Sequence, residues 1–214
     1  MAGREVAKGH PGLYEVLTWV CRRISVLSYL EIGVADGASL LTVMDSAPLV
    51  NRLVLCDAWL PNEWHGRTSH AHIEEMLDRL RYGGVRNYLD GSSHEWLKTL
   101  QDGPAFDLVL VDGGHHFADA AQDLEEGYGL LRAGGILVFD DEDWPEPHEA
   151  LAAHWLKHRW KQLHKKHDGI NSTVALVKPE EPANGSYSGA AEAVRPVAEE
   201  VHTSAISREP GEEG

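Results

Sequence analysis

Apolar residues along this chain occur in two patterns. Short continuous runs are typical of strands buried on both faces, and stretches with an apolar residue every three or four positions are typical of helices. The expected strands span residues 26–32, 52–57, 85–89, 106–111, 135–140, 160–166 and 172–178. The expected helices span residues 11–23, 37–46, 69–82, 93–101, 117–132 and 147–159. This regular alternation predicts an α/β fold whose sheet is covered by helices on both faces.

The last two expected strands are connected differently from the earlier ones. The last two expected strands are joined only by the turn-forming residues 167–171, His-Asp-Gly-Ile-Asn, and so short a link favours an antiparallel hairpin. Earlier in the chain, Gly134 and Gly135 are expected to end the long helix at 117–132. The sequence therefore predicts a Rossmann-like, doubly wound and mostly parallel seven-stranded sheet with a C-terminal antiparallel hairpin.

Composition favours a single domain of this kind. The chain has 214 residues, of which 43% are hydrophobic, enough for one sizeable core. Residues 1–25 are expected to form a helical lead-in, and residues 26–180 the α/β domain. In residues 181–214 the periodicity is lost and Pro, Gly, Ser, Ala and Glu dominate. This acidic tail is expected to be disordered.

Charge and cysteine usage exclude several classes of partner. The net charge is −15 with no basic stripe, so nucleic acid is not expected as a partner. Cys21 and Cys56 lack metal-site spacing and are expected to be reduced thiols in a cytoplasmic protein. With neither a membrane-length apolar run nor a signal-peptide pattern, no membrane partner is expected. The sequence leaves the oligomeric state open.

The first chemical motif lies in residues 29–39, Tyr-Leu-Glu-Ile-Gly-Val-Ala-Asp-Gly-Ala-Ser. An apolar strand containing Glu31 runs into a loop bounded by Gly33 and Gly37, and a helix follows. Such a corner is typical of nucleoside sites in doubly wound sheets. The next strand ends in Asp57, whose two oxygens can accept hydrogen bonds from both ribose hydroxyls. Neither the G-x-G-x-x-G fingerprint nor the P-loop pattern is present.

The second motif joins two later strands. Strand 106–111 ends in Asp112, followed by two glycines, His115 and His116, and strand 135–140 ends in Asp140 and Asp141. Neighbouring parallel strands end at the same edge of a sheet, so the three acids are expected to converge. Their repulsion would be relieved by a cation, and all-oxygen ligation suits Mg²⁺ or a similar divalent ion.

These motifs resemble those of the class I S-adenosylmethionine (SAM)-dependent methyltransferases. The second is similar to that of metal-dependent small-molecule O-methyltransferases of the macrocin/mycinamicin type. The resemblance covers about residues 26–178. It implies a general base, His115, and it implies that Asp112, Asp140 and Asp141 hold the metal, with Asp112 also counted as catalytic. It further implies a set of SAM-binding residues: Glu31, Gly33, Asp36, Gly37, Asp57, Ser92 and Asp112.

The chain departs from this family after the third strand. It reads Asp90-Gly-Ser-Ser93 where family members usually have Gly-Asp-Ser. The contact with the adenine edge is therefore left open between Asp90, Ser92 and Ser93.

The implied activity is SAM-dependent, Mg²⁺-assisted O-methylation of a small-molecule or sugar hydroxyl. Two alternatives are a nucleotide- or NAD-binding Rossmann-like enzyme and a non-catalytic SAM-fold binding module. The acid at each strand tip favours the catalytic interpretation over the module, and the missing dinucleotide fingerprint disfavours NAD.

Several other polar and aromatic side chains have open roles. His116 could replace His115 as the base, and Glu142 and Asp143 could share in metal ligation. Pocket walls could come from Trp59, Trp64 and Trp144, and the acceptor pocket could include His65, His70 and His72. Three later histidines, His154, His158 and His164, are expected on a surface helix and at its exit.

Overall fold

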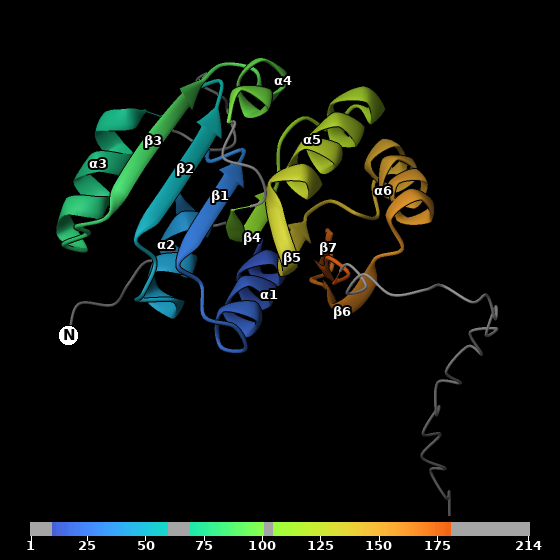
Figure 1. Cartoon of the computed structure of the whole chain (residues 1–214), viewed down its shortest axis with the longest axis horizontal. Coiled ribbons are helices and arrows are strands. Elements are labelled where there is room, and N and C mark those ends of the chain that lie inside the picture. The colour runs from blue at the N-terminus through green and yellow to red at the C-terminus, as the bar shows by residue number, and fades with distance from the viewer. Residues whose placement is uncertain (1–9, 60–68, 101–104, 181–214) are drawn as a thin grey trace, which may run out of the picture. The chain divides into compact units, whose positions relative to one another are not determined.

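The protein is built around a seven-stranded sheet (Figure 1). Its structure, a computed structural model, describes residues 10–59, 69–100 and 105–180. The strands are β1 (Ser28–Ile32), β2 (Arg52–Asp57), β3 (Val85–Asp90), β4 (Phe106–Val111), β5 (Leu131–Phe139), β6 (Lys161–His167) and β7 (Ser172–Val177). Their order is β3-β2-β1-β4-β5-β7-β6. The first five strands pair in parallel, and β7 pairs antiparallel with both β5 and β6. The predicted sheet and hairpin are confirmed, whereas the predicted tail, 181–214, lies outside the described residues.

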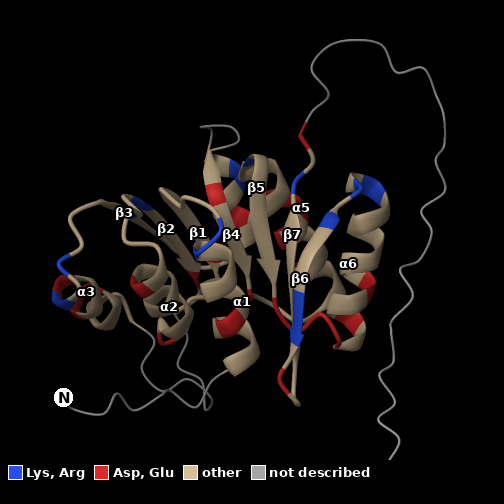
Figure 2. Ribbon diagram, turned by 90° about the horizontal axis from the view of Figure 1, so that it is seen from below, with Lys and Arg blue, Asp and Glu red and all other residues tan. Residues whose placement is uncertain are grey.

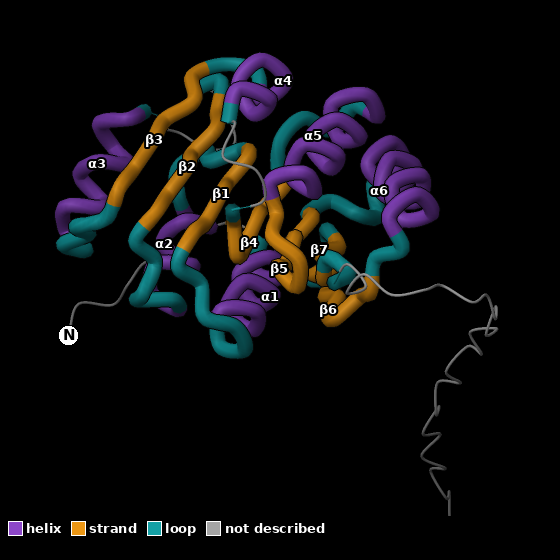
Figure 3. Tube along the Cα trace, viewed as in Figure 1, coloured by secondary structure: helices purple, strands orange, loops and turns teal. Residues whose placement is uncertain are grey.

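Helices cover both faces of this sheet (Figure 3). They are α1 (Pro11–Cys21), α2 (Ala38–Ser46), α3 (His70–Arg79), α4 (Ser93–Trp96), α5 (Phe117–Leu130) and α6 (Pro145–His158), with a 3₁₀ turn, η1, at Leu97–Thr99. Helices α1 to α3 pack into one apolar cluster, and η1, α5 and α6 pack into the other. In β4, Leu108 and Leu110 belong to the first cluster, and Val109 and Val111 belong to the second. The central strand β4 is almost continuously apolar because both of its faces are buried.

The edge of the sheet formed by β6 is different in character. Its sequence, Lys-Gln-Leu-His-Lys-Lys-His, exposes most of its side chains, and its basic residues stand out in Figure 2. Charged edge strands of this kind resist pairing with another chain. No helix within the described ranges is long and apolar enough to cross a bilayer.

Two predicted elements were wrong in detail. Helix α5 ends at Leu130 and β5 begins at the next residue, so Gly134 and Gly135 lie inside a strand and do not end the helix. Gly134 has a φ of +70°, in a stretch where the pairing of β4 with β5 shifts register. The glycines therefore accommodate an irregularity in the strand. The helix expected at 93–101 is only the short α4 followed by η1.

The carboxyl ends of three strands meet at Gly33. Its N–H donates to the carbonyl of Cys56 at the end of β2 (2.9 Å), and Asp112 N–H donates to the carbonyl of Ile32 (2.9 Å). Gly33 has a φ of +85°, and a Cβ atom added there would lie 1.8 Å from the Asp112 carbonyl oxygen. Only glycine lets the loop after β1 approach the end of β4 this closely.

We expect Gly33→Ala to destabilise the protein by at least about 3 kcal/mol, because backbone strain and a clash with main-chain atoms add together. Gly169→Ala is the matched control, since Gly169 also has a positive φ, +99°, but nothing within 4 Å of the added Cβ. Strain alone should cost that variant about 1–2 kcal/mol. Urea unfolding of the two variants measures the difference, and equal losses would contradict the proposed clash.

Candidate functional site

The loop after β1 is fastened by Asp57. Its Oδ2 accepts hydrogen bonds from the N–H groups of Val34 (2.8 Å) and Ala35 (2.9 Å), and its Oδ1 accepts one from Trp59 N–H (2.6 Å). These bonds occupy three of the roughly four lone-pair positions of a carboxylate. The predicted bonds to ribose hydroxyls would therefore use the remaining position or replace a loop contact. That role of Asp57 stays a prediction.

The same loop leads directly into helix α2. Gly37 is the N-cap of α2, with a φ of +81°, and an added Cβ would lie 2.7 Å from the side chain of Ile73 in α3. Asp36 Oδ1 accepts a hydrogen bond from Ala38 N–H (3.2 Å) and so supports the first turn. The predicted SAM-binding residues Gly33, Asp36 and Gly37 thus form one compact turn.

Glu31 lies beneath this turn and is fully buried. The Ser39 hydroxyl donates to its Oε1, whereas its Oε2 has no hydrogen-bond partner among the described residues. Burial raises the pKa of Glu31 to about 8, although interactions with Ser39 and Tyr29 lower it. A buried carboxylate in this state is satisfied by a proton or by a nearby cationic group.

The strand tips of β2 and β3 lie side by side, with Asp57 opposite Asp90. Asp90 Oδ1 accepts a hydrogen bond from Trp59 Nε1 (3.0 Å) and pairs with His70 Nε2 (2.7 Å). The His70 ring stacks on Tyr88 at 4.3 Å between centroids. Trp59 and His70 therefore form an aromatic wall at this edge.

The other two candidates for the adenine contact follow Asp90. Ser92 is the N-cap of α4 and accepts a hydrogen bond from His94 N–H (3.3 Å). The Ser93 hydroxyl donates to the buried Asp123 of α5 (2.5 Å). The structure thus brings Asp90, Ser92 and Ser93 to the predicted edge without ranking them. Trp64 and His65 lie outside the described residues.

The three predicted metal-binding acids also come together. Asp140 N–H donates to the Val111 carbonyl (3.1 Å), which holds the end of β5 against the end of β4. Burial and repulsion from Asp140 and Asp141 raise the pKa of Asp112 well above its usual range. Burial likewise raises the pKa of Asp140 to about 6, with a further contribution from Asp141. Shifts in this direction are expected where carboxylates lie close together in a poorly solvated place.

Two oxygens in this cluster stand out. Asp140 and Asp141 are each only 3% exposed, yet Asp140 Oδ2 and Asp141 Oδ1 form no hydrogen bond within the part of the chain that the structure describes. The φ of Asp141 is +53°, an unfavourable value for a residue with a side chain. A strained, buried acid beside a second acid fits a hard cation better than it fits a purely structural role.

The two neighbouring histidines have different surroundings. His115 Nε2 lies 2.9 Å from Asp141 Oδ2, and this hydrogen bond raises the pKa of His115 against the opposing effect of burial. Ligand atoms of Asp112, His115 and Asp141 all lie within 4.8 Å of one another. His116 instead points to Glu146 (3.6 Å), with its side chain 82% exposed. Only His115 of this pair faces the acid cluster.

Glu142 and Asp143 turn away from the cluster. Glu142 pairs with Lys165 of β6 (2.5 Å), and Asp143 Oδ1 accepts a hydrogen bond from Ser172 N–H (2.7 Å). Both acids therefore bind the C-terminal hairpin. The suggestion that they share in metal ligation does not agree with these contacts.

Three residues that contact the site carry no recognisable signal in the sequence pattern. The Thr173 hydroxyl of β7 donates to Asp140 Oδ1, and His10 Nδ1 lies 3.5 Å from Asp140 Oδ2. Asn171 contacts both His10 and Trp144. These residues come from opposite ends of the domain, so spacing along the chain could not connect them with Asp140.

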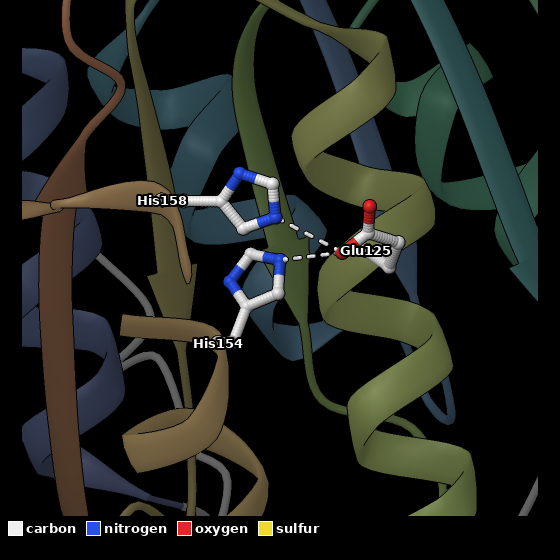
Figure 4. Close-up of side chains that lie close together, drawn as sticks. All are labelled: Glu125, His154 and His158. Carbon is white, nitrogen blue, oxygen red and sulfur yellow. Dashed lines mark hydrogen bonds and ion pairs between the residues drawn. The ribbon is translucent and has the colours of Figure 1, made fainter. Parts of the chain in front are cut away.

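A second cluster joins α5 to α6, where Glu125 lies against His154 and His158 (Figure 4). The Nε2 atoms of His158 and His154 are 3.0 and 3.4 Å from Glu125 Oε2. These are zinc-ligand types. However, Trp160 Nε1, which can only donate, bonds to His154 Nδ1 (2.9 Å). The proton of neutral His154 is therefore on Nε2, which leaves no lone pair there for a metal. We interpret the cluster as a set of polar contacts that hold α5 against α6.

The expectation that His154 lies on the surface was wrong. It is 5% exposed because the rings of Tyr128 and Trp160 pack around it. Burial, helped by the charges of His158 and Lys157, lowers the pKa of His154 to about 4. His154 is consequently neutral at pH 7.

Comparison with known proteins assigns the family. Residues 30–142, more than half of the chain, match the family model described as a methyltransferase domain. This range contains both sequence motifs, from the glycine loop to the acids after β5. The chain therefore belongs to this methyltransferase-domain family.

One curated relative is uncharacterized protein R132 of Acanthamoeba polyphaga mimivirus, 28% identical over 122 residues. The match covers 54% of this chain and 51% of the relative, so the chain spans about half the length of that protein.

Solved structures show the same fold. An O-methyltransferase from Bacillus cereus, in complex with S-adenosylhomocysteine (SAH), has a TM-score of 0.61 at 15% identity, covering 80% of this chain and 83% of that one. The O-methyltransferase TomG from Streptomyces achromogenes, in complex with SAM, has a TM-score of 0.59 at 19% identity, covering 82% and 83%. The N-methyltransferase NodS from Bradyrhizobium japonicum has a TM-score of 0.53 at 18% identity, covering 80% and 98%. The fold thus accommodates different acceptor atoms.

The buried His154 should make stability depend on pH. Its pKa is about 4 in the folded protein and about 6.5 when unfolded, so its contribution is present above pH 6.5 and is lost as the pH falls towards 4. Between pH 7 and 5 this loss is about 2 kcal/mol. Because glutamine does not titrate, the free energy of unfolding of His154→Gln should fall by about 2 kcal/mol less than that of the parent between pH 7 and 5. Urea unfolding across this pH range measures the difference. His148→Gln, at an exposed position of the same helix, should leave the curve unchanged, and parallel curves for all three proteins would contradict the assignment.

Proposed function

We propose that this protein is a SAM-dependent O-methyltransferase that acts, with a divalent metal ion, on a hydroxyl of a small molecule or sugar. The observation that carries the proposal is the meeting of two groups at one edge of the sheet. The glycine loop after β1 and the carboxylates after β4 and β5 are joined there through the contact of Gly33 with Asp112. Within a methyltransferase domain, this edge is where a methyl donor and an acceptor would lie together.

The first group supplies the SAM site. The turn from Gly33 to Gly37 offers a closely approachable backbone for the amino-acid end of SAM. Below it, the unpartnered Oε2 of Glu31 would gain a cationic neighbour in a ligand that carries an ammonium and a sulfonium, and that positive charge would favour the ionised carboxylate. Asp57 would accept the ribose hydroxyls through its remaining lone-pair position or in exchange for a loop contact. Residues at the tips of β3 and β4, among them Ser92 and Asp112, would border the adenine.

The second group fits a divalent ion such as Mg²⁺. Asp112, Asp140 and Asp141 would hold it, because two of these residues bury oxygens that have no hydrogen bond among the described residues. When bound, the ion lowers the pKa of an acceptor hydroxyl and fixes its position. The same charge would relieve the repulsion that raises the pKa of Asp112.

His115 is placed to act as the general base. Its Nε2 bonds to Asp141, which orients the ring beside the acids, and its side chain is 45% exposed, so an acceptor can reach it. In the proposed reaction the imidazole takes the hydroxyl proton, and the oxygen attacks the methyl carbon of SAM. The carbon–sulfur bond breaks, and SAH leaves with the electron pair. A base beside acidic ligands favours a hydroxyl acceptor, which needs deprotonation, over an amine.

The protein should bind SAH and should not bind NAD. Asp57→Ala should weaken SAH binding by roughly 1–3 kcal/mol, the cost of losing a charged hydrogen bond. Asp78→Ala, which changes an exposed acid of α3, is the control and should bind normally. Isothermal titration calorimetry measures all three proteins. Tighter binding of NAD than of SAH by the parent would refute the proposed cofactor.

Methyl transfer should stop in a chelator and resume when Mg²⁺ is restored. Asp140→Ala and Asp141→Ala should abolish turnover while SAH affinity changes little, because SAM would lie mainly against β1 to β3.

His115→Ala should retain SAH and metal binding but lower turnover by roughly 10²–10⁴-fold. His116→Ala is the matched control. Turnover of a hydroxyl acceptor, found by screening a metabolite extract, tests both roles, and full activity in chelator would remove the metal from the mechanism.

A further inference from the structure

The N-terminal lead-in reaches the acid cluster through His10. This residue directly precedes α1, which packs on α2 and against β6 and β7. Its Nδ1 lies 3.5 Å from Asp140 Oδ2, on a side chain that is completely buried. His10 is itself one-third exposed, so it lies at the boundary between the cluster and solvent.

A short chain of hydrogen bonds fixes which atom of His10 carries the proton. Trp144 Nε1, a donor only, bonds to Asn171 Oδ1 (3.1 Å). The amide nitrogen of Asn171 therefore faces His10 Nδ1, 2.7 Å away. Because that amide nitrogen can only donate, Nδ1 must accept, and the proton of neutral His10 is on Nε2.

This arrangement brings two acceptor atoms close together. His10 Nδ1, whose lone pair accepts the bond from Asn171, lies 3.5 Å from Asp140 Oδ2, which forms no hydrogen bond with any described residue. Asp141 Oδ1 is buried nearby and is also without a partner in the described ranges. Ligand atoms of His10, Asp140 and Asp141 all lie within 4.8 Å of one another. A cation between them would accept electron pairs from all three residues.

We propose that His10 Nδ1 is a nitrogen ligand of the divalent ion, together with Asp140 and Asp141. The inference rests on the proposed metal site and adds a ligand from outside the residues matched to the methyltransferase domain. To hold the ion, Nδ1 would have to give up its bond from Asn171, whereas Asn171 could keep its bond to Trp144. His115, which bonds to Asp141 Oδ2, is not one of these ligands and remains the proposed base.

An imidazole ligand changes which ion the site prefers. Mg²⁺ favours oxygen ligands, whereas imidazole suits Fe²⁺, Ni²⁺, Cu²⁺ and Zn²⁺. The site should therefore favour a transition-metal ion over Mg²⁺, and Mn²⁺, the first ion of that series, serves as its paramagnetic probe. It also means that metal binding holds the start of α1 against the end of β5.

The test uses the full-length chain and Mn²⁺ alone. Electron spin-echo envelope modulation of bound Mn²⁺ detects a coordinated imidazole nitrogen, and calorimetry gives the affinity. We expect ¹⁴N modulation in the parent. His10→Ala should lose the modulation and bind Mn²⁺ at least about tenfold more weakly, with a smaller change for Mg²⁺. Asn171→Ala should keep the modulation and bind at least as tightly, because Asn171 competes for Nδ1.

His115→Ala and His148→Ala are the matched controls, and both should keep the modulation. If it disappears in His115→Ala and survives in His10→Ala, the nitrogen ligand is His115 and the inference is wrong. If His10→Ala binds Mn²⁺ like the parent while Asp140→Ala does not, the metal site stands without His10. If the parent and Asp140→Ala both fail to bind Mn²⁺, the proposed metal site and this inference fail together. Thermal melts of each variant establish that it is folded.

Discussion

The close approach of Gly33 to the Asp112 carbonyl is the constraint on which the rest of the site depends. It joins the end of β1 to the end of β4, and the bond from Gly33 N–H to Cys56 joins both to β2. The loop that follows β1 and the acid that ends β4 are thereby held within one short stretch of the sheet edge. A side chain at position 33 would separate them, so the two halves of the proposed site can lie together because Gly33 has no Cβ atom.

Beyond that contact, the edge gathers several acidic side chains in a place where water has little access. Glu31, Asp112 and Asp140 all have raised pKa values, with burial as the leading cause in each case. A fold selected for stability alone would not leave oxygens of Glu31, Asp140 and Asp141 buried without hydrogen bonds from the described residues. Their presence, and the left-handed backbone of Asp141, indicate that stability is given up here for ligand binding.

Much of this could be predicted from the sequence because it depends on local patterns. Continuous apolar runs identified the strands, and the acids at their ends were visible as the residues where each run stops. The burial of His154 could not be predicted, since it depends on Tyr128 and Trp160 from separate elements. The start of β5 was misplaced because glycines that usually end a helix here serve a strand irregularity. His10 was missed because its contact with Asp140 spans most of the domain.

The position of Asn171 and Thr173 has a consequence for how the protein is made. Both residues come from the end of the domain, and Thr173 and Asn171 complete the surroundings of Asp140 and His10 respectively. During synthesis the acids after β4 and β5 leave the ribosome before this hairpin exists. A nascent chain that has not yet paired β7 with β5 thus lacks the Thr173 hydroxyl that bonds to Asp140. The surroundings of Asp140 are complete only when the last strand is in place. The proposed site therefore forms only after the whole sheet has folded.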